Sequence, residues 1–332
     1  MTGAAGRRRP PARSLRRLAT VLAALLVCTQ AGAQTYPSRP IKLIVGYPPG
    51  GSGDFLTRLM ADELTRELGV AVVVDNRPGA GGTIAADVVA KSPPDGYTVL
   101  NGGHQTINKE LYRKLPYDPD KDLVPICRVA TGTTILVVNN NLQVKDLLEL
   151  IAYAKANPGK LFLASAGFGS APHLASVQFE ASAGVKFTTV QFKGGGPAAQ
   201  SLLAGDTQVM FATSPTVMGF IKAGRVRPLI VSKRHSSPSI PGIPGAEEAG
   251  LAGYESIFWF GLFVPTGTPA SVIKRLHEAA AKSLAKADVR EKIALQGMDP
   301  TPSTTPETFD AEIKAEAPGW EQAIRASGAR VE

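Results

Sequence analysis

After its N-terminal region, the chain alternates short apolar runs with stretches of helical periodicity. The apolar run Ile41 to Val45 is typical of a strand. After the glycines of residues 50–53, apolar side chains recur at spacings of three and four from Phe55 to Leu68, which predicts a helix that ends at Gly69. The same order is then repeated, with strands at 71–74 and 97–100 and a helix at 83–91. This alternation predicts a parallel sheet with helices on both faces.

A second set of alternating elements begins near residue 135. Its predicted strands are 135–138, 161–164, 187–192, 209–211, 228–231 and 255–264, and its predicted helices are 144–156, 170–183, a segment ending at 203, 271–285 and 306–327. The Pro- and Gly-rich segment 236–250 is typical of a loop with a short helical piece. Because loops after parallel strands gather at one edge of a sheet, the strand-to-helix junctions are the first places to look for a site.

Residues 1–33 have the pattern of an export signal. Six arginines and no acidic residue lie within 7–17, an apolar run follows at 18–28, and Ala31-Gly32-Ala33 fits the small-x-small cleavage rule. An uncleaved anchor is the alternative, but the run is shorter than the about 20 apolar residues that span a bilayer. We therefore expect export to the periplasm and a mature chain that begins near Gln34. Arg16-Arg17 leaves both the general and the twin-arginine route open.

Removal of this signal changes the charge of the chain. The full chain carries +8, and six of those charges are the signal arginines, so the mature chain is near +2. A net charge this small argues against a nucleic acid or an anionic membrane as the partner. The remaining 299 of 332 residues suffice for two domains of ordinary size. One cysteine remains, Cys127, and its apolar surroundings predict a small buried side chain rather than a nucleophile.

The sequence motifs of several enzyme classes are missing. No serine stands in a G-x-S-x-G pattern, and neither the GxxxxGK[ST] nor the G-x-G-x-x-G phosphate-binding pattern is complete. The histidines are widely spaced, at His104, His173, His235 and His277, so no pair has metal-ligand spacing. We expect no metal, no cofactor and no catalytic residue.

Two strand-to-helix junctions carry the candidate chemistry. The first is residues 47–54 (YPPGGSGD), and the second is residues 165–173 (SAGFGSAPH). Each places glycines and a hydroxyl directly before a helix, where unpaired backbone N–H groups and the helix dipole favour an anion. Two such helix starts across a cleft predict a site for a small molecule with one or two carboxylates.

The same residues also have a purely structural interpretation. Ser52 and Ser170 are typical N-caps, and His173 in the first helical turn suits a local hydrogen bond. Asp54 would repel a carboxylate if it faced the ligand, so it is expected to cap its helix or orient a water. Arg77, in NRPGAGG, is at least as well suited to stabilise its turn as to bind a carboxylate.

Several long segments, in the same order, resemble the Bug family of periplasmic solute receptors of tripartite tricarboxylate transporters. They are YPSRPIKLIVGYPPGGSGD, VVVDNRPGAGGTIAADVVAKSPPDGYTVL, INKELYRKLPYDPDKDLVPI, ANPGKLFLASAGFGSAPHLA, FKGGGPAAQSLLAGD, IKAGRVRPLIV and FWFGLFVPTGTP. The resemblance runs from about Tyr36 to the C-terminus.

This resemblance implies a fold of class α/β, the type II periplasmic-binding-protein fold, with two α/β lobes and a ligand cleft between them. One lobe would comprise residues 34–133 and 260–332, and the other residues 134–259, with strands crossing near 130–136 and 258–263. The ligand would be a small organic carboxylate, and the partners would be the membrane permease subunits of the transporter. We expect a monomer that binds without catalysis.

The expected ligand-binding residues combine the two junctions with residues that the resemblance places at the cleft. They are Tyr47, Pro49, Gly50, Gly51, Ser52, Asp54, His104, Thr106, Ser165, Gly167, Phe168, Gly169, Ser170, His173, Phe192, Ala212, Thr213 and Ser214. Tyr47, Phe168 and Phe192 are candidates for an apolar wall, although Phe192 suits the core equally well.

Two positions depart from the family pattern. Family members commonly carry an acidic residue where this chain has Ala212, and a smaller residue where it has His104. Without that acid, an ammonium group in the cleft would lack a charged partner, which is costly. We therefore expect a ligand without an ammonium group, such as a dicarboxylate, a tricarboxylate or an aromatic acid. A sensory receptor and an exported enzyme acting on a carboxylate are the alternative functions.

Overall fold

The computed structural model describes residues 36–103, 109, 112, 114–301 and 304–327. Contacts divide the chain into two units, Met1–Ser38 and Arg39–Glu332. In the first unit the described residues are 36–38, with a cis peptide bond between Tyr36 and Pro37. The expected signal at 1–33 lies outside the described residues. All that follows concerns the second unit.

The N-terminal set of elements builds a parallel group of strands. Strand β1 (Ile41–Val45) pairs in parallel with β2 (Val72–Asn76) and with β3 (Thr98–Gly103). Helices α2 (Ser52–Leu68) and α3 (Thr83–Ala90) connect them, and the short η1 (Ala80–Gly82) precedes α3. Helix α2 ends at Gly69, whose φ of 74° is the left-handed cap conformation that the sequence predicted.

One long strand joins the two halves of the sheet. Strand β4 (Leu123–Asn139), which follows the four-residue helix α4 (Pro119–Asp122), pairs antiparallel with β9 (Ile257–Pro265) over its first part. Its last residues pair antiparallel with β7 (Val209–Thr213) and β8 (Val226–Val231). The sheet order is therefore β2-β1-β3-β9-β4-β7-β5-β6, with β8 and β10 (Met298–Pro300) also on β4.

The middle set repeats the strand–helix pattern. Parallel strands β5 (Phe162–Ser165), β6 (Thr188–Gln191) and β7 are connected by α6 (Ala171–Ala183) and α7 (Gly195–Ala204), while α5 (Leu147–Ala156) precedes β5 and α8 (Ser214–Lys222) follows β7. Buried residues of α5 and α6 pack on one face of these strands, and those of α7 and α8 pack on the other.

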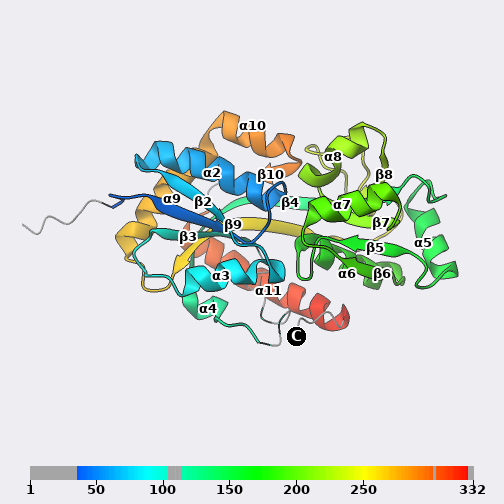
Figure 1. The fold of residues 1–332 in the computed structure, drawn as a ribbon, viewed down its shortest axis with the longest axis horizontal. Coiled ribbons are helices and arrows are strands. Elements are labelled where there is room, and N and C mark those ends of the chain that lie inside the picture. The colour runs from blue at the N-terminus through cyan, green and yellow to red at the C-terminus, as the bar shows by residue number, and fades with distance from the viewer. Residues whose placement is uncertain (1–35, 104–108, 110–111, 113, 302–303, 328–332) are drawn as a thin grey trace, which may run out of the picture. The chain divides into compact units, whose positions relative to one another are not determined.

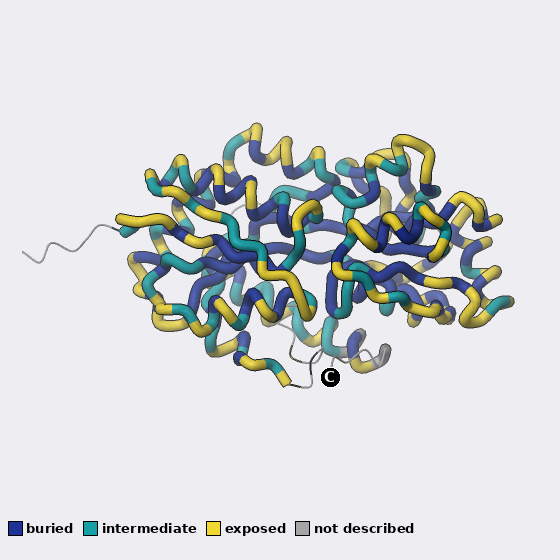
Figure 2. The backbone as a smooth tube through the Cα atoms, viewed as in Figure 1, coloured by how far each residue is buried: buried dark blue, intermediate teal, exposed yellow. Residues whose placement is uncertain are grey.

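The C-terminal helices cover the first half of the sheet. They are α9 (Ala270–Ala285), α10 (Ala287–Leu295) and α11 (Pro306–Ser327). Helix α2 lies with α9 on one side, and α3 with α11 on the other (Figure 1). Phe309 of α11 packs against Trp259 and Phe263 of β9 in the core of that side. Figure 2 shows the strands buried between helices whose outer faces are exposed.

Most predicted elements are confirmed, within a few residues at their ends. The structure adds α4, α8, α10 and β10, which the sequence analysis did not identify, and it extends the strand predicted at 135–138 back to Leu123. Residues 236–250 form turns and isolated bridges without the predicted helical piece. The prediction of a parallel sheet is only partly right. Strands β4 and β9 pair antiparallel, so the joined sheet is mixed. Cys127 is fully buried, as predicted.

Candidate functional site

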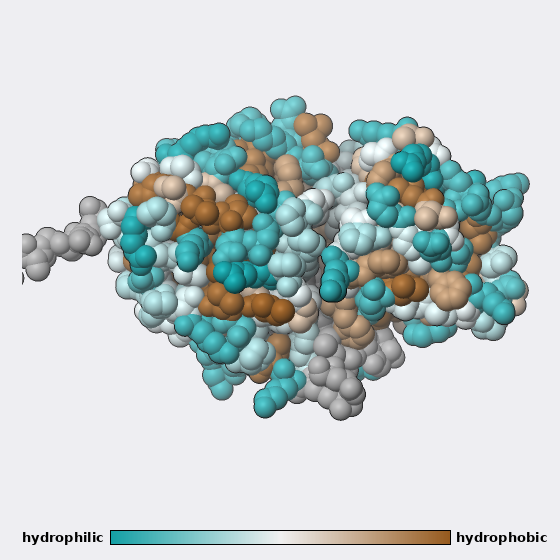
Figure 3. All heavy atoms as spheres, in the orientation of Figure 1, coloured by the Kyte–Doolittle hydropathy of each residue, from teal (hydrophilic) through white to brown (hydrophobic). Residues whose placement is uncertain are grey.

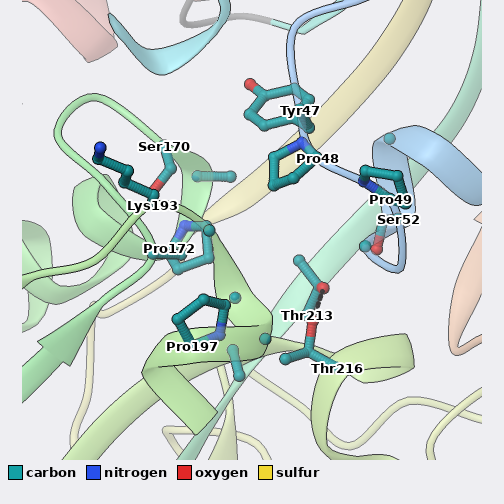
Figure 4. A pocket seen from close by; sticks show the side chains of 18 of the residues that line it. Tyr47, Pro48, Pro49, Ser52, Ser170, Pro172, Lys193, Pro197, Thr213 and Thr216 are labelled. Carbon is teal, nitrogen blue, oxygen red and sulfur yellow. Dashed lines mark hydrogen bonds between the residues drawn. The ribbon is translucent and has the colours of Figure 1, made fainter. Parts of the chain in front are cut away.

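A pocket opens where four strand-to-helix junctions meet. The junctions follow β1, β5, β6 and β7, and the pocket between them has a volume of about 190 Å³. It is lined by residues of both sheet halves: Tyr47, Pro48, Pro49, Gly51, Ser52, Gly53, Ala166, Ser170, Ala171, Pro172, Lys193, Gly194, Gly195, Gly196, Pro197, Met210, Ala212, Thr213, Thr216, Phe258 and Phe260. Figure 4 shows Tyr47, Pro48 and Ser52 on one side of this space and Pro172, Pro197 and Thr213 on the other.

The start of α2 presents free donors to this pocket. Gly51 is the N-cap and has no side chain to bond the first-turn amides, so the alternative that Ser52 caps the helix is wrong. Ser52 lines the pocket, and its buried hydroxyl has no hydrogen-bond partner among the residues that the structure describes. Because an unpaired buried hydroxyl is costly, this group is available to bond a ligand or a bound water.

The carboxylate of Asp54 bonds to the protein rather than lining the pocket. Its oxygens accept hydrogen bonds from the Gly50 amide (3.1 Å), Arg58 Nε (3.0 Å) and Asn76 Nδ2 (3.0 Å). Burial opposes ionisation of this group, but these hydrogen bonds outweigh it and lower its pKa. Asp54 therefore fixes the glycine loop that precedes α2, and the expectation that it caps the helix is wrong, because it bonds to Gly50, Arg58 and Asn76 rather than to a first-turn amide.

At the start of α6, side chains of this junction form hydrogen bonds with its own backbone amides. Ser170 is the N-cap, and its hydroxyl accepts from the His173 amide (3.4 Å) and donates to Gly167 O (2.7 Å). His173 Nδ1 accepts from the Gly169 amide (3.3 Å), which is the local bond expected of it. Burial, helped by the charge of Lys186, lowers the pKa of His173 to about 4, so the ring is neutral at pH 7.

The structure brings two further helix starts to the pocket. Gly194 caps α7 without a side-chain hydrogen bond, and Gly195 and Gly196 follow it. Thr213 caps α8, and its hydroxyl shares a hydrogen bond of 3.0 Å with that of Thr216. Lys193 lies on the rim with its side chain extending away from the pocket (Figure 4).

The aromatic wall of the pocket comes from β9 and the loop after β1. Phe260 makes edge-to-face contacts with Tyr47 (6.0 Å between ring centroids) and with Phe258 (5.8 Å). Met210 and Ala212 of β7 are buried beside them. Phe258 and Phe260 alternate along the strand with Trp259, which faces α11 instead.

The predicted site residues fall into three groups. Those that line the pocket are Tyr47, Pro49, Gly51, Ser52, Ser170, Ala212 and Thr213. Those described but not among the lining are Gly50, Asp54, Ser165, Gly167, Phe168, Gly169, His173, Phe192 and Ser214. His104 and Thr106 lie outside the described residues.

Several of the residues near the junctions pack against or pair with other side chains of the chain and do not line the pocket. Phe168 lies on the His173 ring, with 4.5 Å between centroids, and Phe192 packs against the core of the second half. Arg77 pairs with Asp75 at 3.0 Å within its own turn, as the structural interpretation had it.

Sequence reasoning missed the α7 junction and the two phenylalanines. The signal for α7 was present, because KGGGP at 193–197 has the same glycine-rich character as the two junctions that were chosen. Phe258 and Phe260 belonged to a strand recognised as aromatic, but strand alternation alone does not say which face meets a pocket.

Two features are absent from the described part of the chain, a metal site and a membrane-spanning helix. The described residues contain no cluster of three or more His, Cys, Asp or Glu side chains placed to hold a metal ion. Within the same residues, every helix is too short or too polar to cross a membrane.

Two sets of alternating strands and helices are joined by β4, and a pocket lies where their helices begin. These features define a solute-binding protein of the periplasmic-binding-protein fold. Residues 56–326 match the family model "Tripartite tricarboxylate transporter family receptor". The chain belongs to this family.

Solved structures of three relatives are similar over most of the chain. R. palustris Rpa4515 with adipate is 33% identical, with a TM-score of 0.84, over 88% of this chain and 98% of that one. The periplasmic binding protein BugD is 30% identical, with a TM-score of 0.84, over 90% of this chain and all of BugD. MatC from Rhodopseudomonas palustris with bound malate is 31% identical, with a TM-score of 0.81, over 87% of this chain and all of MatC.

Proposed function

We propose that this chain captures a small organic carboxylate in the pocket and hands it, unchanged, to a membrane permease. The observation that carries the proposal is the start of α2, where uncapped amides and the unpartnered Ser52 hydroxyl meet the same buried space. Relatives whose structures hold adipate and malate support a carboxylate as the ligand.

The physical basis is the electrostatics of a helix N-terminus. The first-turn amides of Ser52, Gly53 and Asp54 point out of the helix, and the dipole of this 17-residue helix adds partial positive charge. Such an end stabilises an anion by about 0.3–1 kcal/mol when exposed and by up to about 2 kcal/mol when partly buried. Hydrogen bonds to a charged acceptor add to this, so no Arg or Lys is required.

The two halves of the sheet act as lobes in this proposal. Residues 34–133 and 260–332 form one lobe and residues 134–259 the other, with β4 passing between them. Because the pocket takes its lining from both halves, ligand binding draws the lobes together about the crossing strand. Closure buries the carboxylate and creates the surface that the permease reads.

The cellular setting follows from the N-terminal residues and the family. Residues 1–33 direct export, the mature monomer works in the periplasm without a cofactor, and its partners are the permease subunits of a tripartite tricarboxylate transporter. The site residues proposed for ligand contact are Gly51, Ser52 and Tyr47 of the first lobe and Ala212, Thr213 and the start of α7 in the second.

Calorimetry on protein freed of bound ligand tests the proposal. The protein is unfolded, dialysed and refolded, then titrated with adipate, malate, citrate, benzoate and glutamate. Mass spectrometry of the acid recovered from the complex checks that it is unchanged. We expect at least one acid without an ammonium group to bind stoichiometrically and to be recovered intact. Failure of every acid to bind, or turnover of the bound one, would overturn the proposal.

A further inference from the structure

We infer that Asn76, which lies outside the ligand pocket, is a positioning residue for it. Its side-chain amide fixes the loop 47–50, which carries Tyr47 of the pocket wall and leads into α2. This role rests on the proposed function, because the ligand is taken to bind at the start of α2. Asn76 begins the segment 76–82 (NRPGAGG), none of whose residues lines the pocket.

Strand pairing brings the Asn76 side chain to this loop. Asn76 is the last residue of β2 and lies opposite Val45, the last residue of β1, and the Arg77 amide donates to Val45 O at 2.8 Å. Because the two strands are parallel, the loops that follow them leave the sheet at the same edge. The surface is hollowed where the two halves meet (Figure 3), and the loop after β1 lines the first-half side of the pocket. A side chain at the end of β2 can therefore hold that loop from outside the pocket.

The Asn76 amide group holds both ends of the loop. Its Nδ2 donates to Tyr47 O at 2.9 Å and to Asp54 Oδ1 at 3.0 Å. The other oxygen of Asp54, Oδ2, accepts from the Gly50 amide at 3.1 Å. The first residue of the loop is thus bound directly, and the last one is bound through Asp54. An NH2 group has two donors, so these two bonds use its full capacity.

Arg58 fixes the orientation of the Asn76 side chain. Arg58 Nη2 donates to Asn76 Oδ1 at 3.3 Å, and Arg58 Nε donates to Asp54 Oδ2 at 3.0 Å. Reversal of the amide would turn its NH2 group toward the guanidinium, so that donor would meet donor. The side chain of Arg58 is 53% exposed and that of Asp54 is 7% exposed. The bond between Asn76 and Asp54 is therefore the inner part of this network, and Arg58 lies on its solvent side.

The rest of the segment holds the Tyr47 side chain. The Tyr47 hydroxyl donates to Gly81 O at 3.2 Å, while its backbone carbonyl is bound by Asn76. Gly81 and Gly82 have φ of 63° and 100°, the left-handed region that glycine adopts without strain. A Cβ on Gly46 would lie 2.4 Å from Gly82 Cα, so this turn lies directly against the start of the loop. Tyr47 is therefore bound at its backbone and at its side chain by the same segment.

The loop itself offers few donors for hydrogen bonds. Pro48 and Pro49 lack an amide hydrogen, so Tyr47 and Gly50 supply the backbone donors of the loop. Gly50, with φ of 99°, is free to adopt many other conformations. The side-chain bonds from Asn76 therefore restrain the loop before a ligand arrives. Without them, ordering of the loop falls on the binding step and costs binding free energy.

Two variants of Asn76 test the role by calorimetry on the ligand-free protein, with the acid that binds the wild-type chain most tightly. Asn76→Ala removes the amide, and Asn76→Asp keeps its size and the acceptor for Arg58 but has no donor for Tyr47 O. We expect the Kd to rise at least about five-fold in both, since loss of a preorganised loop accounts for such a factor. An unchanged Kd in both variants, with the protein folded by circular dichroism, would overturn the inference and leave the proposed function standing.

Asn140→Ala is the matched control. The Asn140 Nδ2 also donates to a backbone carbonyl of a distant segment, Gly224 O at 2.8 Å, but neither residue lines the pocket. This variant should lose stability in urea denaturation, as Asn76→Ala does, but keep the wild-type Kd. A rise in its Kd equal to that of Asn76→Ala would show a general effect of stability and overturn the inference.

Hydrogen exchange tests the positioning of the loop without any ligand. In peptides that cover residues 47–54, mass spectrometry should show exchange at least about three-fold faster in Asn76→Ala, because Asp54, which holds the Gly50 amide, loses a hydrogen bond. Asn140→Ala should leave these peptides unchanged. Unchanged exchange in Asn76→Ala would overturn the inference. Failure of every acid to bind the wild-type chain, with faster exchange in Asn76→Ala, would overturn the proposed function but not the fixing of the loop by Asn76.

Discussion

Pro48 and Gly194 touch across the pocket: a Cβ on Gly194 would lie 2.6 Å from Pro48 Cγ. Pro48 precedes α2 in the first half of the sheet, and Gly194 caps α7 in the second. Gly194 also has φ of 118°, a conformation that side chains rarely adopt. A second contact joins the same halves, because a Cβ on Gly81 would lie 2.9 Å from Phe168 O. The two halves of the sheet thus approach each other closely at these two positions, and glycine permits the approach.

Gly194→Ala should therefore weaken ligand binding by obstructing closure. We expect the Kd of the best-binding acid to rise about ten-fold or more, and the unfolding free energy to fall by about 1 kcal/mol from the positive φ. Calorimetry and urea denaturation measure the two effects. Gly242→Ala is the matched control, since its φ is 83°, its Cβ would meet open space, and it is not one of the residues that line the pocket. If both variants lost the same stability and neither lost affinity, the Pro48 contact would have no part in closure.

Ser52→Ala should separate binding from folding. Among the described residues the buried Ser52 hydroxyl has no partner, so its removal should leave the unfolding free energy of ligand-free protein unchanged or slightly raised. The Kd should rise about ten-fold, because a hydrogen bond to a charged acceptor is worth about 1.5–3 kcal/mol. Ser170→Ala offers the contrast, since loss of that cap should cost about 1 kcal/mol of stability. A stability loss in Ser52→Ala without loss of affinity would contradict the assignment.

His173 should make stability depend on pH. Its pKa in the folded protein is about 4, against an ordinary value of 6.5, because the ring is buried. Between these values the unfolded chain binds more protons than the folded one, so stability is complete above pH 6.5 and falls as pH drops toward 4. The loss attributable to this group is about 3 kcal/mol. His173→Gln should remove that part of the slope in urea denaturation at pH 7 and pH 4.5, and an unchanged slope in this variant would contradict the prediction.

The fold was largely predictable because its signals are local. Strand β1 and helix α2 follow from an apolar run, a glycine turn and a three-four periodicity, all within 30 residues. Helix α8 was missed because Pro215 resembles a breaker, although proline is well tolerated in a first turn. Strand β4 was predicted too short because Pro125 and Gly132 interrupt its pattern. Pairing with β9 keeps both residues in the strand, and that long-range contact cannot be read from the sequence.

The site was predictable only as far as each junction could be judged alone. Ser52 and Ser170 carry the same local signal, yet one lacks a partner and the other caps its helix. The difference depends on the rotamer and on which groups lie opposite, which are tertiary properties. Phe258 and Phe260 meet the pocket because β9 lies beside β4 and presents one face to it. That placement involves segments more than 100 residues apart.

The contact of Glu316 with β4 and β9 gives the last prediction. Glu316 of α11 accepts from Arg128 at 2.6 Å and from Trp259 Nε1 at 2.7 Å, and the Arg128 side chain is only 11% exposed. Glu316→Gln keeps an acceptor for Trp259 but leaves the largely buried guanidinium with Glu312 as its remaining carboxylate, at 3.2 Å. Because a buried charge that loses a partner is costly, we expect a loss of about 2 kcal/mol in urea denaturation. Asp310→Asn, which removes an exposed pair with Lys314 on the same helix, should cost less than about 0.5 kcal/mol. Equal effects of the two substitutions would show that Glu316 contributes no more than a surface charge.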